Sequence, residues 1–218
     1  MTREPADRPE HPRLNNRDMD AIKEVLRHLI LIFWSQGGKK DWLSIVAGSY
    51  ETWQSLGKLP GMDNPEIVAS IRELREKYTP EELEKELESE FVRIFVNTKG
   101  GISAPLYHSC YHDEQNLLMK EPALEMSRML DQAGIDLGSD VGEPPDHLCI
   151  ELEYLFFLLS HFRVHNDPQL WEHIRLFSRD FMLPWLDIFQ KKIPQHEPAS
   201  FFAHSALAMN RLVRFLGG

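Results

Sequence analysis

Apolar residues recur at steps of three and four along most of this chain, and sustained alternation of apolar and polar residues is nearly absent. Steps of three and four place side chains on one face of an α-helix, whereas a half-buried strand needs a step of two. The stretch MDAIKEVLRHLILIFW shows the helical pattern most clearly, with apolar residues at Ile22, Val25, Leu26, Leu29 and Phe33. The spacing predicts an all-α protein, a single globular domain of about seven to nine helices packed helix on helix.

Residues that favour helix starts stand before several of these periodic stretches. Asp41 precedes one of them as a potential N-cap, and Asn64 precedes another that opens with Pro65. Thr79 is followed three residues later by Glu82, the spacing of a capping box. These signals predict the residues at which three of the helices begin, and they support the all-helical interpretation.

Composition shifts divide the chain into a polar, proline-rich lead-in, two helical halves and a linker. We predict a disordered lead-in over 1–17, an N-terminal half over 18–134, a linker over 135–145 and a C-terminal half over 146–218. The segment NTKGGISAPLYHSCYHDEQNLL within the first half does not have a helical pattern. In the second half, Pro184 interrupts a long helical stretch, which it must kink or split.

The charge and cysteine content exclude some classes of function. The 218 residues include 24 lysines and arginines against 34 aspartates and glutamates, which gives a formal net charge of −10. Nucleic acids and anionic membranes bind basic surfaces, so neither is expected as the main partner. The longest apolar block, 152–159, is too short for a bilayer, which requires about 20 residues. Cys110 and Cys149 form no CxxC pair, and reduced thiols in a cytoplasmic protein are expected.

The stretch GEPPDHLCIELEYLFFLLSHF places polar residues at the start of a very apolar helix. Asp146 suits the helix start, where a carboxylate can accept backbone N–H groups. His147 would lie in the first turn, where the helix dipole lowers the pKa of an imidazole, and Glu151 would share its face and pair with it. Glu153 is costly to bury without a partner. Both glutamates can instead lie on a solvated edge or pair with an arginine, Arg163 or Arg175.

The alternative to a binding surface is a small helical enzyme that uses a metal or a thiol. His161 and His165 are four residues apart, a spacing compatible with metal ligands, but no HExxH motif accompanies them. Cys110 stands beside His108, whereas Cys149 is expected to be buried in a helix and inert. No oxyanion or phosphate-binding motif supports catalysis. We therefore expect no catalytic residues and no metal.

The segment SAPLYHSCYHDE is the second unusual feature of the sequence. Its aromatic residues do not follow a helical spacing, and Pro105 precedes them. Tyr107 and Tyr111 offer flat faces with hydroxyl groups, as binding surfaces often do. The segment is therefore either a binding loop or an ordered loop whose aromatic residues fill the core.

These two segments carry a family resemblance. EPPDHLCIELEYL resembles the E-P-x-D-H-x-x-x-E-x-x-x-L signature of the TorD/DmsD family of redox-enzyme maturation chaperones. The upstream EFVRIFVNTKGGISAPLYHSCY is similar to the second sequence block of that family. Here Leu106 stands between Pro105 and Tyr107, where the family often has the proline directly before the aromatic residue.

The resemblance implies a cytoplasmic, non-catalytic chaperone. Such proteins bind the twin-arginine signal peptide and the apo-form of a molybdenum- or tungsten-cofactor oxidoreductase, assist cofactor insertion and prevent premature export. The resemblance also implies a homodimer formed by domain swapping in some members and weak binding of guanine nucleotides, and it implies neither nucleic-acid binding nor stable membrane insertion.

A receptor for such a peptide needs carboxylates for the arginines and an apolar groove for the rest. Carboxylates are expected from Glu143, Asp146, Glu151 and Glu153. His147 is expected to order the join between the two halves. Apolar contacts are expected from Pro105, Tyr107, Tyr111, Phe91, Phe95 and Leu148.

Overall fold

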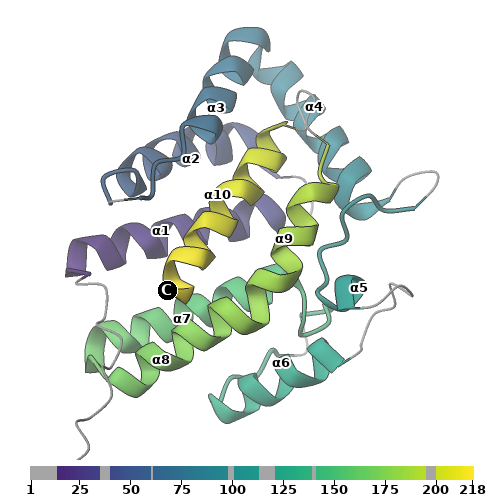
Figure 1. The fold of residues 1–218 in the computed structure, drawn as a ribbon. Coiled ribbons are helices and arrows are strands. Elements are labelled where there is room, and N and C mark those ends of the chain that lie inside the picture. Colours follow the sequence, from purple (N-terminus) through teal and green to yellow (C-terminus); the bar gives the residue numbers. More distant parts are fainter. Residues whose placement is uncertain are drawn as a thin grey trace, which may run out of the picture.

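The computed structural model describes residues 14–34, 40–59, 61–97, 101–112, 121–138, 141–194 and 200–218. Within these residues the chain forms α-helices and π-helical segments, and an isolated antiparallel bridge is the one β-type pairing. Figure 1 shows the helices in chain order. They are α1 (Asn16–Phe33), α2 (Trp42–Leu56), α3 (Pro65–Lys77), α4 (Pro80–Phe91), η1 (Val92–Val96), α5 (Ser109–His112), α6 (Glu121–Gln132), α7 (Leu148–His165), α8 (Pro168–Leu176), η2 (Phe177–Met182), α9 (Leu183–Lys192) and α10 (Ser200–Gly217).

The predicted all-α class is confirmed. The π-helical segment η1 continues α4, and η2 joins α8 to α9, so the described ranges contain nine continuous helical rods. Residues 1–13 of the predicted lead-in lie outside the described residues, and α1 begins at Asn16, so the end of that range is helical. None of the helices in the described ranges is both long and apolar enough to cross a membrane.

Two of the predicted helix caps form as expected. The Asp41 carboxylate accepts the backbone N–H three residues later at 3.0 Å. Thr79 and Glu82 form the reciprocal capping box of α4, in which Glu82 accepts the Thr79 N–H at 2.9 Å. Asn64 occupies the N-cap of α3, but its side-chain amide donates to the Met62 carbonyl at 2.8 Å, and it makes no capping bond to α3. The sequence therefore predicted the start of α3 correctly, although the side-chain capping bond expected from Asn64 does not form.

Helices from both predicted halves share one hydrophobic core. α1 packs against α2 and also against α7, and α10 packs against α9, η2 and α3. Figure 1 shows α1 passing behind α10, with α7 and α8 alongside. The apolar face predicted for α1 is buried, including Ile22, Val25, Leu26, Leu29 and Phe33. The division of the chain into two halves remains a prediction.

Aromatic rings fill the centre of this core. Phe33 lies edge-on to Phe95 and to Phe189, with ring centroids 5.6 and 5.8 Å apart. Phe95 also packs against Phe91 and Phe202, at 5.3 and 5.5 Å. These edge-on and tilted contacts are the geometries that aromatic pairs prefer. These rings come from α1, α4, η1, α9 and α10, and their contacts hold these helices together.

Pro184 is accommodated without ending its helix. As the second residue of α9 it has no N–H to donate to the preceding turn. The wider turns of η2 end immediately before Leu183, so the helix changes pitch where that hydrogen bond is missing. The predicted kink or split therefore takes the form of a π-helical segment between α8 and α9.

Candidate functional site

The two unusual sequence segments lie against each other. Residues 101–112 and 141–148 are joined by an antiparallel bridge between Tyr107 and His147. The His108 N–H donates to the Asp146 carbonyl at 3.0 Å, and the Leu148 N–H donates to the Leu106 carbonyl at 2.8 Å. We call this contact the junction. It places the loop after η1 directly at the start of α7.

Asp146 anchors the first segment from within the junction. Its Oδ2 accepts the Ser109 backbone N–H at 2.8 Å and also the Ser109 hydroxyl. Both residues are fully buried, and Asp146 Oδ1 has no hydrogen-bond partner among the described residues. Ser109–His112 form the single turn α5 in a segment that was predicted to be non-helical. Asp146 was predicted to cap its own helix, but its carboxylate serves a segment far away in sequence.

His147, not Asp146, is the N-cap of α7. Its Nδ1 accepts the Cys149 N–H at 3.1 Å. The ring is fully buried, edge-on to Trp34 and to Tyr107 at 5.3 and 5.2 Å. Burial lowers the pKa of His147 to about 4, so the ring is neutral at pH 7. A neutral imidazole suits this position because Nδ1 must be an acceptor for the backbone N–H.

Glu151 connects the junction to α9. Its Oε2 accepts the Trp185 indole N–H at 3.0 Å, and its Oε1 lies 3.1 Å from His108 Nδ1. The predicted pair between Glu151 and His147 is wrong, because His108 from the facing segment takes that place. His108 stacks on Trp185 with ring centroids 5.4 Å apart.

Burial determines the protonation of this pair. It raises the pKa of Glu151 well above its ordinary value, and it lowers the pKa of His108 to about 4. The uncharged forms of both groups are therefore favoured, and a single proton between them completes the hydrogen bond. The arginines considered as partners lie elsewhere, since Arg163 pairs with Asp20 and Arg175 with Glu172.

The partly exposed residues of the junction form its rim. The Tyr107 hydroxyl donates to Glu143 Oε2 at 2.7 Å, and the Tyr111 hydroxyl donates to the Pro105 carbonyl at 2.7 Å. The Lys192 ammonium lies 4.7 Å from the centroid of the Tyr111 ring. We call Glu143, Tyr107, Pro105 and Tyr111 the rim. These four residues keep part of their surface in contact with solvent.

Burial separates the predicted site residues into two groups. Glu153 is exposed and joins the rim residues as accessible from solvent. Phe91, Phe95 and Leu148 are at most 3% exposed and belong to the core. Asp146, His147 and Glu151 are fully buried and belong to the same group. Solvent therefore reaches the rim and Glu153, whereas the core group is closed to it.

The residues considered for catalysis are also buried. Cys110 is 5% exposed and Cys149 fully buried, and burial raises the pKa of the Cys149 thiol well above its ordinary value. In the described part of the chain no group of histidine, cysteine or carboxylate side chains is arranged to hold a metal ion. His161 and His165 lie on the exposed face of α7 with ring centroids 6.0 Å apart.

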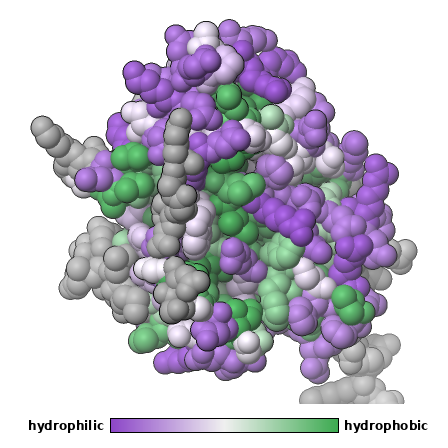
Figure 2. All heavy atoms as spheres, turned by 180° about the vertical axis from the view of Figure 1, so that it is seen from behind, coloured by the Kyte–Doolittle hydropathy of each residue, from purple (hydrophilic) through white to green (hydrophobic). Residues whose placement is uncertain are grey.

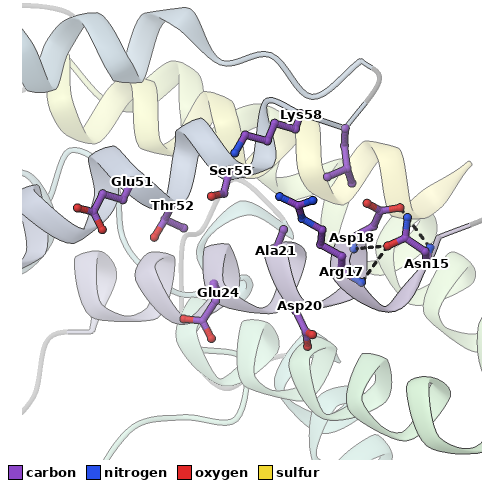
Figure 3. Close-up of a pocket in the computed structure, with 11 residues that line it drawn as sticks. Asn15, Arg17, Asp18, Asp20, Ala21, Glu24, Glu51, Thr52, Ser55 and Lys58 are labelled. Carbon is purple, nitrogen blue, oxygen red and sulfur yellow. Dashed lines mark hydrogen bonds between the residues drawn. The ribbon is translucent and has the colours of Figure 1, made fainter.

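A surface groove of about 540 Å³ lies between α1 and α2, away from the junction. Figure 3 shows acidic side chains along it, with Arg17 extending from α1 toward α2. Most of its carboxylates are already engaged. Asp18 completes the capping box of α1, Asp20 pairs with Arg163, and Glu24 pairs with Arg27. We assign no ligand to this groove.

Sequence reasoning missed three residues that build the junction. Ser109, Trp185 and Trp34 supply three hydrogen bonds and a ring contact to the predicted residues. Trp185 and Trp34 read only as core residues of helical stretches. Ser109 stands within a quoted motif, but nothing in its local sequence indicates a partner at the start of the C-terminal half.

Comparison with known proteins places this fold in a family. The family model for the nitrate reductase delta subunit matches residues 63–191, more than half of the chain. The chain belongs to this family. The match spans both segments of the junction, from α3 to the end of α9.

The curated relatives of this nitrate reductase delta subunit family member are chaperones. "Chaperone protein TorD" of Salmonella arizonae is 28% identical over 200 residues, which covers 89% of each chain. The protein of the same name from Photobacterium profundum is 27% identical over 164 residues, 73% of this chain and 74% of that one. The predicted resemblance is thus confirmed. Because these relatives are chaperones, they confirm the expectation that the chain is not an enzyme.

The fold is also found among solved structures. The crystal structure of a putative redox enzyme maturation protein from Archaeoglobus fulgidus aligns over 99% of this chain and 100% of that one. The TM-score is 0.50 and the identity 19%, so this likeness shows the fold alone. It agrees with the all-helical architecture of this member of the nitrate reductase delta subunit family.

Proposed function

We propose that this chain acts in the cytoplasm on one molybdenum- or tungsten-cofactor oxidoreductase. It binds the twin-arginine signal peptide and the apo-form of that enzyme, assists cofactor insertion and delays export. The observation that carries the proposal is the junction itself, where the two family motifs meet in one ordered contact. Family membership and the chaperone relatives support the same function.

The rim supplies the chemistry that such a peptide needs. The Glu143 carboxylate can accept an arginine guanidinium, and the Tyr107 and Tyr111 rings offer faces to its apolar residues. A net charge of −10 increases the encounter rate with a basic peptide. Glu153 adds an exposed carboxylate near the start of α7.

The buried carboxylates contribute by holding the rim in place. Asp146 fixes Ser109, and Glu151 connects the segment through His108 to Trp185. The rim residues Tyr107 and Tyr111 flank these anchored positions in sequence. Peptide affinity therefore depends on Asp146 and Glu151 through the position of the loop, and a direct bond to a guanidinium would require the junction to open.

Titration calorimetry with a synthetic peptide tests the function. A peptide with two consecutive arginines and an apolar tail is expected to bind, and to bind more weakly as salt rises. Replacing both arginines by lysine removes bidentate pairing and should weaken binding. Equal affinity for the two peptides would indicate a general helix-binding scaffold, and absence of binding to either would refute the proposal.

Asp146 variants separate direct from indirect contact. In Asp146→Asn the amide oxygen can still accept from Ser109, so the loop stays anchored while the charge is lost. Asp146→Ala removes both. If the contact is indirect, Asp146→Asn retains most of the affinity and Asp146→Ala loses it. Equal loss in both variants would instead show that the charge binds the peptide. Glu125→Gln, an exposed change on α6, serves as the matched control.

A further inference from the structure

Lys40 occupies a partly buried site built by three other parts of the chain. Its ammonium donates to the Leu31 and Ile32 carbonyls at the end of α1, at 3.0 and 2.6 Å. It also lies 3.9 Å from the centroid of the Phe91 ring and 4.8 Å from that of Trp42. Carbonyl oxygens and aromatic faces are the groups that hold organic cations in proteins. We call these four contacting residues the cage.

The Glu88 carboxylate lies beside the cage and favours a positive charge in it. Glu88 Oε2 accepts the Trp42 indole N–H at 2.8 Å, and its charge attracts the Lys40 ammonium. Burial nevertheless dominates and lowers the pKa of Lys40 to about 7. Burial therefore disfavours the charged form of the lysine that now occupies the cage. A guanidinium is more weakly hydrated, stays charged and stacks on aromatic faces, so it suits the cage better.

Lys40 enters the cage from outside any helix. It precedes Asp41, the N-cap of α2, and it makes no hydrogen bond to α2 in the described contacts. Its side chain thus reaches across to α1 and to the end of α4. A flexible side chain in this position can leave the cage without breaking a helix.

We propose that the cage is a binding site for an arginine side chain of a client peptide, and that Lys40 is its intramolecular occupant. Binding of the peptide displaces Lys40. This inference rests on the proposed function, because it names the partner of the cage. It also explains how the face of Phe91, a predicted peptide-binding residue, becomes available without opening the core.

The surroundings of the cage fit a cation followed by apolar residues. Leu31, Leu43 and Val92 are 51%, 38% and 39% exposed, and each contributes to the cage or adjoins a cage residue in sequence. Figure 2, seen from behind the view of Figure 1, shows hydrophobic patches down the middle of that side of the molecule, interrupted by hydrophilic residues. The junction is close by, since Trp34 at the end of α1 touches the His147 ring.

Chemical rescue tests the cage without any peptide. In Lys40→Ala the cage is empty, and n-butylammonium should raise the melting temperature by roughly 2–5 °C at saturating concentration. Lys77→Ala is the matched control, because Lys77 lies over the Tyr78 ring at an exposed position. n-Butanol tests for simple filling of space. Rescue of Lys40→Ala no greater than that of Lys77→Ala, or equal rescue by n-butanol, would overturn the cage.

Peptide affinity tests the displacement. A lysine that occupies the cage for about 90% of the time lowers the apparent affinity about tenfold, so Lys40→Ala should bind the two-arginine peptide about tenfold more tightly. n-Butylammonium should compete with the peptide in this variant. Lys40→Met, whose apolar stem still fills the cage, keeps the fold if Lys40→Ala does not and should not respond to the amine.

The outcomes distinguish the two proposals. Rescue together with unchanged peptide affinity in Lys40→Ala would overturn the displacement while the wild-type titration still supports the function. If the wild-type chain does not bind the peptide, the proposed function and the displacement fail together, and the rescue experiment alone decides whether the cage binds cations.

Discussion

Removal of the Asp146 carboxylate should release the segment 101–112 from α7. Oδ2 accepts two hydrogen bonds from Ser109, one from its backbone N–H and one from its hydroxyl. Loss of an acceptor from a buried N–H costs about 1–3 kcal/mol, and a hydrogen bond to a charged group contributes about 1.5–3 kcal/mol. We expect Asp146→Ala to lower the free energy of unfolding by about 3–5 kcal/mol.

A double-mutant cycle isolates this interaction. Ser109→Ala removes the hydroxyl and leaves the backbone bond, so it should cost about 1–2 kcal/mol. In the Asp146→Ala background the same change should cost much less, which gives a coupling of about 1–2 kcal/mol. Asp146→Asn keeps an acceptor for both Ser109 donors and should cost about 1 kcal/mol.

Urea unfolding at pH 7 measures the four free energies, and amide hydrogen exchange locates the change. Asp146→Ala should speed exchange in residues 104–112 more than in α10, whereas Asp146→Asn should not. If the effects of Asp146→Ala and Ser109→Ala add within about 0.3–0.5 kcal/mol, the two residues are energetically independent. The anchoring role of Asp146 would then be refuted.

Three further changes test other parts of the structure. Burial raises the pKa of Glu151, so the folded state holds a proton that the unfolded chain releases above its ordinary pKa, and wild type loses stability as pH rises. In urea unfolding, Glu151→Gln should therefore gain stability relative to wild type as pH rises from 5 to 8, and a constant difference would contradict this. Burial lowers the pKa of His108 and His147 from 6.5 to about 4, so protons bind the unfolded chain first and stability should fall as pH drops from about 6.5 toward 4, with an upper limit of about 3 kcal/mol for each ring. Because Glu151 contributes with the opposite sign in this window, the measurement is made in Glu151→Gln, where a flat unfolding free energy would show that these rings are not neutral in the fold. Thr79→Ala removes one half of the α4 capping box and should lower stability by about 1 kcal/mol in thermal unfolding, while no loss would mean that the cap is redundant.

The predictions that succeeded depend on residues close together in sequence. Asp41 and the Thr79–Glu82 pair contact backbone groups within three residues, so their effect is set before the chain packs. The apolar face of α1 is also a local pattern, and all five of its predicted residues are buried. The predictions that failed concern partners. Glu151 was assigned to His147 one turn away, but it contacts His108 and Trp185 on other elements.

By itself, the sequence determined the helical class, most helix boundaries and the two motifs that identify the family. Helix formation and capping are governed by contacts within about four residues, and those contacts can be read from a linear pattern. Only the tertiary structure decided that the two motifs face each other, that Asp146 and Glu151 are buried, and that Lys40 lies over Phe91. These outcomes depend on how all the helices pack together, because burial and long-range pairing are properties of the assembled core and no single segment encodes them.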